Sequence, residues 1–172
     1  MPNALNLVGM FGFPRTVNEK AARTVAGVVA LTGVIALAFS AEWLLIPLAY
    51  GFIARVLAGP TLSPLAQFAT RVAAPRLGEP KEVAGPPKRF AQAMGATITT
   101  LGSIAYLAGS VTVAGVCLAL LVIAATLESV FAFCLGCHIF SWLMRIGLVP
   151  DEVCVECANL ASRHARADSP AA

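Results

Sequence analysis

Four stretches of this chain are apolar and almost uncharged, and each approaches the length that a helix needs to cross a bilayer. They cover about 21–40, 43–57, 90–109 and 111–133. A hydrocarbon core about 30 Å thick requires roughly 20 apolar helical residues. Only 12% of the residues are charged, about half the share found in a typical soluble domain. The pattern argues against a water-soluble globule and predicts an all-α fold, an integral membrane bundle of four transmembrane helices.

Short signals mark the ends of these predicted spans. Asn18 precedes the first span as a helix N-cap, and Gly109 with Ser110 forms the turn between the third and fourth. The second span contains Pro47, which a membrane helix tolerates when neighbouring groups satisfy the freed carbonyl. Small residues in the third span predict close packing within the chain, with a homo-oligomer as the alternative: Gly95, Ala96, Gly102, Ser103 and Ala105.

The basic residues are distributed asymmetrically. All twelve Lys and Arg lie before or at the start of the first span, in the central loop and its borders, or after the last span, and the two hairpin turns carry none. The positive-inside rule therefore predicts a multi-pass protein of the inner (plasma) membrane with both termini cytoplasmic. A net charge of +3 is too small to indicate nucleic acid as a partner. The chain divides into a cytoplasmic segment 1–18, a four-span domain 19–133 with a cytoplasmic loop 58–89, and a C-terminal double-CxxC module with a polar tail, 134–172.

The central loop contains a predicted helix and a linker. Ser63 and Pro64 read as N-cap and first helical position, and an apolar face follows at helical spacing: Leu65, Phe68, Ala69 and Val72. This helix lies either on the cytoplasmic leaflet or against the bundle. A set of helix breakers then predicts a stiff, non-helical linker: Pro75, Gly78, Pro80, Gly85, Pro86 and Pro87.

Four of the five cysteines form the pattern C-x2-C-x16-C-x2-C, with the pairs Cys134/Cys137 and Cys154/Cys157. This spacing is typical of four-thiolate zinc sites, because each CxxC turn supplies two sulfurs to one side of a tetrahedron. Both pairs fall on the predicted cytoplasmic side, where thiols stay reduced. The first hypothesis is therefore a zinc ion that folds a scaffold or docking module, with an iron–sulfur cluster as a variant of the same ligand set.

The same cysteines suit a second chemistry, so the sequence leaves open whether the protein is an enzyme. As a membrane thiol oxidoreductase, it would exchange a disulfide between Cys134/Cys137 and a thioredoxin-like partner, and Cys154/Cys157 would relay it. Inert packing is the third alternative. We expect Gly136 to break the fourth helix, so that Cys137 begins a new helix that runs through Ile146.

Three further residues could have either a functional or a structural role. Glu128 is an intramembrane carboxylate, which suggests a proton relay or a small transporter subunit, or else an ion pair with Arg55 or Arg145. His138 could add a ligand to the cysteine site or simply face lipid headgroups. Cys117 shares a face of the fourth helix with Glu128 and reads as packing.

No nucleotide-binding glycine loop, nucleophile elbow or zinc-protease motif is present in the sequence. Four segments closely resemble a bacterial integral-membrane family named domain of unknown function 4395: VNEKAARTVAG (17–27), LAGPTLSPLAQ (57–67), VAGPPKRFAQAMG (83–95) and LESVFAFCLGCHIF (127–140). The resemblance covers about 17–146 and implies a membrane location with Cys134 and Cys137 as motif residues; Cys154 and Cys157 lie beyond it. Family members occur beside genes for thioredoxin-like or sulfurtransferase proteins, so the resemblance also implies thiol or sulfur chemistry with such a partner.

Overall fold

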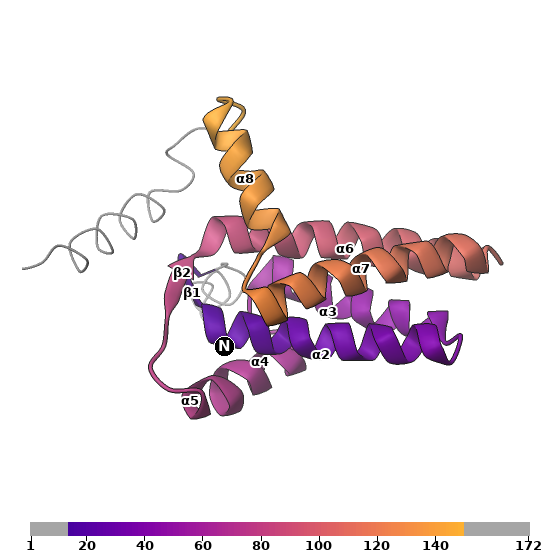
Figure 1. Ribbon diagram of the computed structural model, residues 1–172, viewed down its shortest axis with the longest axis horizontal. Coiled ribbons are helices and arrows are strands. Elements are labelled where there is room, and N and C mark those ends of the chain that lie inside the picture. Colours follow the sequence, from indigo (N-terminus) through magenta and orange to yellow (C-terminus); the bar gives the residue numbers. More distant parts are fainter. Residues whose placement is uncertain (1–13, 150–172) are drawn as a thin grey trace, which may run out of the picture.

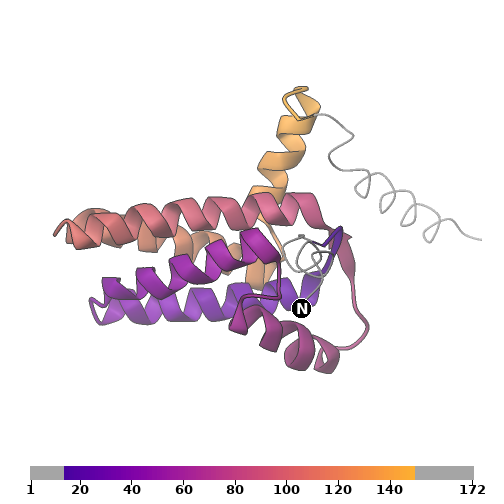
Figure 2. The same ribbon diagram turned by 180° about the vertical axis from the view of Figure 1, so that it is seen from behind.

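The computed structural model describes residues 14–149, and helices make up 77% of them. Four helices run side by side as a bundle (Figures 1 and 2): α2 (Glu19–Ala38), α3 (Leu45–Ala58), α6 (Gly85–Leu107) and α7 (Val111–Phe131). Helix α2 packs on α7, α3 packs on α6, and α6 packs on α7. The predicted all-α class is confirmed, and each apolar stretch forms one helix.

Two of the helices in the described part of the chain, α2 and α7, are long and apolar enough to cross a membrane by length and composition. Helix α3 has 14 residues and follows a single 3-10 turn, η1 (Glu42–Leu44). The helices of the bundle therefore give coarse support for membrane association.

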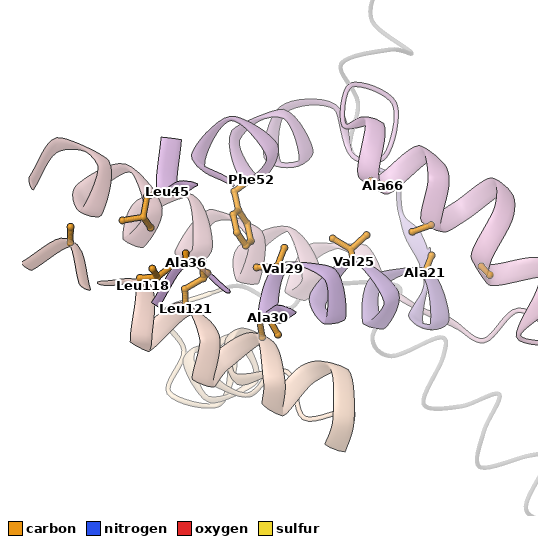
Figure 3. Close-up of a cluster of buried hydrophobic side chains, with 14 residues drawn as sticks. Ala21, Val25, Val29, Ala30, Ala36, Leu45, Phe52, Ala66, Leu118 and Leu121 are labelled. Carbon is orange, nitrogen blue, oxygen red and sulfur yellow. The ribbon is translucent and has the colours of Figure 1, made fainter. Parts of the chain in front are cut away.

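Buried apolar side chains of α2, α3 and α7 form a cluster (Figure 3), and partly buried residues of α6 pack against it: Ala96, Ile98 and Tyr106. Val29 of α2, Leu45 of α3 and Leu118 of α7 are almost completely buried. On α6, a Cβ at Gly95 would lie 2.4 Å from Phe52 Cε1, and one at Gly102 would lie 2.9 Å from Leu45 Cδ1. The predicted close packing of small residues within the chain is confirmed, because a Cβ at either position would require the neighbouring side chains to shift.

A two-stranded sheet, which the sequence did not predict, joins the starts of α2 and α6. Strand β1 (Thr16–Asn18) pairs antiparallel with β2 (Glu82–Ala84). The Asn18 side chain accepts a hydrogen bond from the backbone N–H of Lys20 at 3.0 Å, which confirms the predicted N-cap. Lys81 Nζ lies 2.8 Å from Glu19 Oε2 beside this sheet. The starts of α2 and α6 therefore lie at one end of the bundle (Figure 1).

The loop helix is longer than predicted and packs against α2. It consists of α4 (Pro64–Phe68), a π-helical turn η2 (Ala69–Ala73) and α5 (Ala74–Arg76). Ser63 Oγ accepts from the Ala66 N–H at 3.4 Å, as expected of the predicted N-cap. Its inward face carries Ala66, Ala69 and Ala74, whereas Phe68 is 55% exposed. Of the predicted apolar face, Ala69 therefore packs against the bundle, whereas Phe68 stays exposed.

The predicted non-helical linker is also wrong at both ends. Pro75 lies within α5, and Pro86 and Pro87 lie in the first turn of α6. Proline is tolerated at the start of α6 because the first N–H groups of a helix have no partner within the helix. Helix α6 consequently begins at Gly85, five residues before the predicted span, and brings Lys88 into the bundle.

The fourth helix ends earlier than predicted. Helix α7 stops at Phe131, Ala132 adopts a left-handed conformation with φ 56°, and α8 (Leu135–Arg145) begins directly after Cys134. Gly136 lies inside α8, so the prediction that it breaks the helix is wrong; it allows close packing on Ala91 instead. Helix α8 leaves the bundle at a steep angle (Figure 1), anchored by Phe140, whose ring centroid lies 5.8 Å from that of Phe90.

Candidate functional site

The first cysteine pair lies where the chain turns from α7 into α8. Cys134 is the N-cap residue of α8, and Cys137 lies in its first turn. The two Sγ atoms are 2.7 Å apart, and the Cys137 thiol donates to Cys134 Sγ. Cys134 is 6% exposed, whereas Cys137 is only partly buried. One sulfur is therefore protected inside the fold and the other is accessible.

The two thiols are electrostatically unequal. The hydrogen bond from Cys137 lowers the pKa of the Cys134 thiol, and the charge of Lys88 acts in the same direction, while burial and Glu128 oppose it. The same hydrogen bond, together with burial, raises the pKa of the Cys137 thiol. The free N–H groups at a helix N-terminus also favour a thiolate at the N-cap. When the pair loses one proton, the negative charge therefore resides on Cys134.

A buried ion pair lies next to the cysteines. Lys88 Nζ of α6 is 2.5 Å from Glu128 Oε1 of α7, and the two side chains are 9% and 15% exposed. The partner of Glu128 is therefore Lys88, and the predicted pairing with Arg55 or Arg145 is wrong. Sequence reasoning missed Lys88 because it placed this residue in the loop. The signal was the Gly-Pro-Pro start of a helix directly before it.

Arg55, another buried cation, feels the charge of Glu128, but its hydrogen bonds go to other residues. Its Nε donates to Gln92 Oε1 at 2.8 Å, and its Nη1 lies 3.4 Å from Ser63 Oγ. The guanidinium carbon also stands 4.4 Å from the centroid of the Phe52 ring. Arg55 thus links the end of α3 to α6 and to the start of the loop helix.

His138 borders the cysteine pair without joining it as a third ligand. Its ring stacks on Phe133 with centroids 4.2 Å apart, and its Nδ1 lies 3.2 Å from the carbonyl oxygen of Cys134. Within residues 14–149, no three His, Cys, Asp or Glu side chains come together as a metal-binding group. Cys154 and Cys157, the other half of the predicted zinc set, lie outside the described residues.

Cys137 opens onto a polar cavity of about 350 Å³. Its wall includes Lys88, Glu128 and His138, and Arg23 lies at its edge. Arg23 donates to the carbonyl oxygen of Ser129 at 3.0 Å and so caps the last turn of α7. Cys117, by contrast, lies away from this cavity, where its Cβ faces Gly102 of α6, as expected of a packing residue. Cys137 is therefore reachable through this cavity.

The fold and the site define an all-α protein with a dithiol at the N-terminus of a helix. Residues 17–145 match the family model described as domain of unknown function (DUF4395), so the chain belongs to that family. The match contains Cys134, Cys137, Lys88 and Glu128. Comparison with curated proteins and with solved structures finds no match.

Proposed function

We propose that this protein is a membrane-embedded thiol oxidoreductase that exchanges its Cys134–Cys137 disulfide with a thioredoxin-like protein. The observation that carries the proposal is the placement of two sulfurs 2.7 Å apart at the start of α8, both bordering an open cavity, with Cys137 the more exposed of the two. The cavity is lined by three basic side chains and two carboxylates, and this small excess of positive charge would favour an approaching thiolate.

The exchange follows from the inequality of the two thiols. A thiolate of the partner attacks Cys137 Sγ, the Cys134–Cys137 bond breaks, and Cys134 leaves as a thiolate. A second thiol of the partner then attacks the mixed disulfide, releasing Cys137 as a thiol and the partner as a disulfide. Two electrons pass from the partner to the protein, and a low-pKa thiol such as Cys134 is the better leaving group.

The sulfur separation supports a dithiol over a preformed zinc site. Two thiolates on one tetrahedral zinc, each at about 2.3 Å, lie about 3.8 Å apart. The observed 2.7 Å is far shorter and suits a pair that opens and closes an S–S bond. A zinc scaffold would require this pair to spread and to be joined by Cys154 and Cys157.

We further propose that α2, α3, α6 and α7 all span the inner membrane, with both termini cytoplasmic. The Lys and Arg residues of the described chain belong to the segments at one end of the bundle: the starts of α2 and α6, the end of α3, the loop helix and α8. Helix α8, at a steep angle to the bundle, would then lie along the interface with Trp142, which is 60% exposed, at headgroup level. The dithiol would stand at the cytoplasmic surface.

The test uses chains that each retain a single cysteine, either Cys137 or Cys134, with the others replaced by serine. The retained thiol is activated as a mixed disulfide with thionitrobenzoate, and a thioredoxin variant with one active-site cysteine is added. Cys137 should release thionitrobenzoate and form a covalent adduct about tenfold faster than buried Cys134, since access controls exchange. A chain that retains only Cys117 is the control.

Two results would contradict the proposal. The first is the absence of an adduct at Cys137, and the second is equal reactivity of Cys134 and Cys137. Elemental analysis of the unmutated protein adds an independent check: one zinc per chain, lost on Cys134→Ser, would replace the oxidoreductase by the four-thiolate scaffold.

A further inference from the structure

A second cavity, of about 180 Å³, lies inside the helix bundle on the other side of the cysteine pair. It is bounded by α2, α3, α6, α7 and the start of α8, and its walls are mostly apolar, including Val25, Val29 and Leu121. Its polar groups are Gln92, Glu128 and the Cys134 thiol. A dry cavity of about 150 Å³ already accommodates a benzene-sized ring. The volume and lining therefore suit one apolar ring with a polar edge.

Cys134 and Glu128 are the two residues that line both this apolar cavity and the polar cavity described above. Cys137 lines only the polar one. The dithiol thus stands between two compartments: Cys137 faces the polar cavity, and Cys134 borders both that cavity and the bundle interior. A redox pair in this position can receive electrons on one side and deliver them on the other.

The apolar cavity reaches the outer surface of the bundle between α6 and α7. Leu120, which is 52% exposed, and the partly exposed Met94 and Ala124 lie along this side. In the proposed membrane arrangement, this side faces hydrocarbon, because Leu120 lies near the middle of α7. A ligand would then enter laterally from the bilayer, which selects for a lipid-soluble molecule.

We propose that the apolar cavity binds the ring of a membrane quinone, which reoxidises the Cys134–Cys137 dithiol. This inference rests on the proposed function and names its electron acceptor. A bond forms between the two sulfurs as both S–H bonds break, and the two electrons pass to the quinone ring. The two protons go to the two quinone oxygens, so that one disulfide and one hydroquinone are formed.

The polar groups of the cavity match this reaction. The amide nitrogen of Gln92 can donate to a quinone oxygen, because Arg55 already engages the amide oxygen at 2.8 Å. Glu128, held by Lys88, borders the sulfur that gives up electrons and can pass protons between the polar cavity and the ring. An acyl chain would fill the same space but could not accept a hydrogen bond from Gln92 or exchange protons with Glu128.

The experiment uses the full-length protein in liposomes, reduced and freed of reductant, with a short-chain ubiquinone as the probe under anaerobic conditions. Hydroquinone formation is followed by absorbance, and the Cys134–Cys137 disulfide by mass spectrometry. We expect one hydroquinone per disulfide. Ala124→Leu, which fills the cavity, should lower kcat/KM for the quinone by about tenfold or more. The matched control is Ala119→Leu on the same helix, away from the lining, which should leave kcat/KM unchanged.

Disulfide exchange with thioredoxin is measured on each chain in parallel, so that the two proposals can fail separately. Normal exchange without hydroquinone formation would overturn the quinone site and leave the oxidoreductase standing. Equal effects of Ala124→Leu and Ala119→Leu would also overturn it, as would displacement of the bound quinone by a saturated fatty acid at equal concentration. Hydroquinone formation without thioredoxin exchange would support the quinone site and contradict the soluble partner.

Discussion

Lys88 and Glu128 form an ion pair, 2.5 Å between Nζ and Oε1, that joins the first turn of α6 to the end of α7 beside Cys134. Both side chains are largely withdrawn from solvent, and both also face the polar cavity. The pair therefore serves the packing of two helices and the electrostatics of the dithiol at once.

Breaking this ion pair should destabilise the protein, because the remaining group is left buried without a partner. We expect Glu128→Gln or Lys88→Met alone to lower the free energy of unfolding by about 3 kcal/mol. The double variant should cost less than the sum of the two, which denaturant titration in detergent measures. Strict additivity would show that the two groups do not depend on each other.

Removing the hydrogen-bond donor of Cys137 should raise the pKa of the Cys134 thiol, since that bond is the largest cause of its lowered value. The pH midpoint of Cys134 alkylation by iodoacetamide should therefore move upward in Cys137→Ala. It should move less in Cys137→Ser, which retains a donor. Cys117→Ala provides the matched control, and a midpoint that is the same in all variants would contradict the assigned interaction.

Gly136→Ala should push α8 away from α6, because its Cβ would lie 2.5 Å from Ala91 Cα, a backbone atom that cannot move aside. We expect a loss of about 1–3 kcal/mol in the free energy of unfolding. Gly115→Ala is the matched control, since nothing lies within 4 Å of its added Cβ. That substitution should stabilise helix α7 by up to about 1 kcal/mol. A Gly136→Ala protein as stable as the control would contradict the packing of α8.

Single cysteines introduced into a cysteine-free chain should report the orientation in the membrane. Ser110→Cys, in the turn between α6 and α7, should react with a membrane-impermeant maleimide added to intact cells. Glu79→Cys, between α5 and β2, should react only after the cells are opened. The reverse pattern would contradict the cytoplasmic placement of the loop, and reaction of both in intact cells would contradict the four-span arrangement.

Local signals in the sequence predicted local structure well. Asn18 and Ser63 cap the helices that they were expected to cap, because an N-cap needs only a side-chain oxygen and the next few N–H groups. The turn between α6 and α7 was predicted equally well, because it needs only one residue, Gly109, that tolerates a φ of 81°. Hydrophobic run lengths likewise identified the four long helices.

The site itself depended on contacts that no local pattern encodes. The partner of Glu128 is forty residues away in the sequence, and it became visible only once α6 was seen to begin at Gly85. The α7–α8 break falls at Ala132, which carries a left-handed backbone without being glycine. The break was therefore predicted at the wrong residue. Gly136 allows α8 to approach Ala91 closely and does not form a turn.

The pairing of β1 with β2 sets the order in which the fold can assemble during biosynthesis. Thr16 pairs with Ala84, so the first strand must wait, unpaired, until the ribosome has made α2, α3 and the entire loop helix. Only then can the bundle close at the end that carries the dithiol, and α8 is synthesised later still. A nascent chain stalled before residue 82 would contain α2 and α3 but not β2, and so would lack the strand pairing that joins the starts of α2 and α6. The cysteine pair is therefore put in place last, after the helices that surround it.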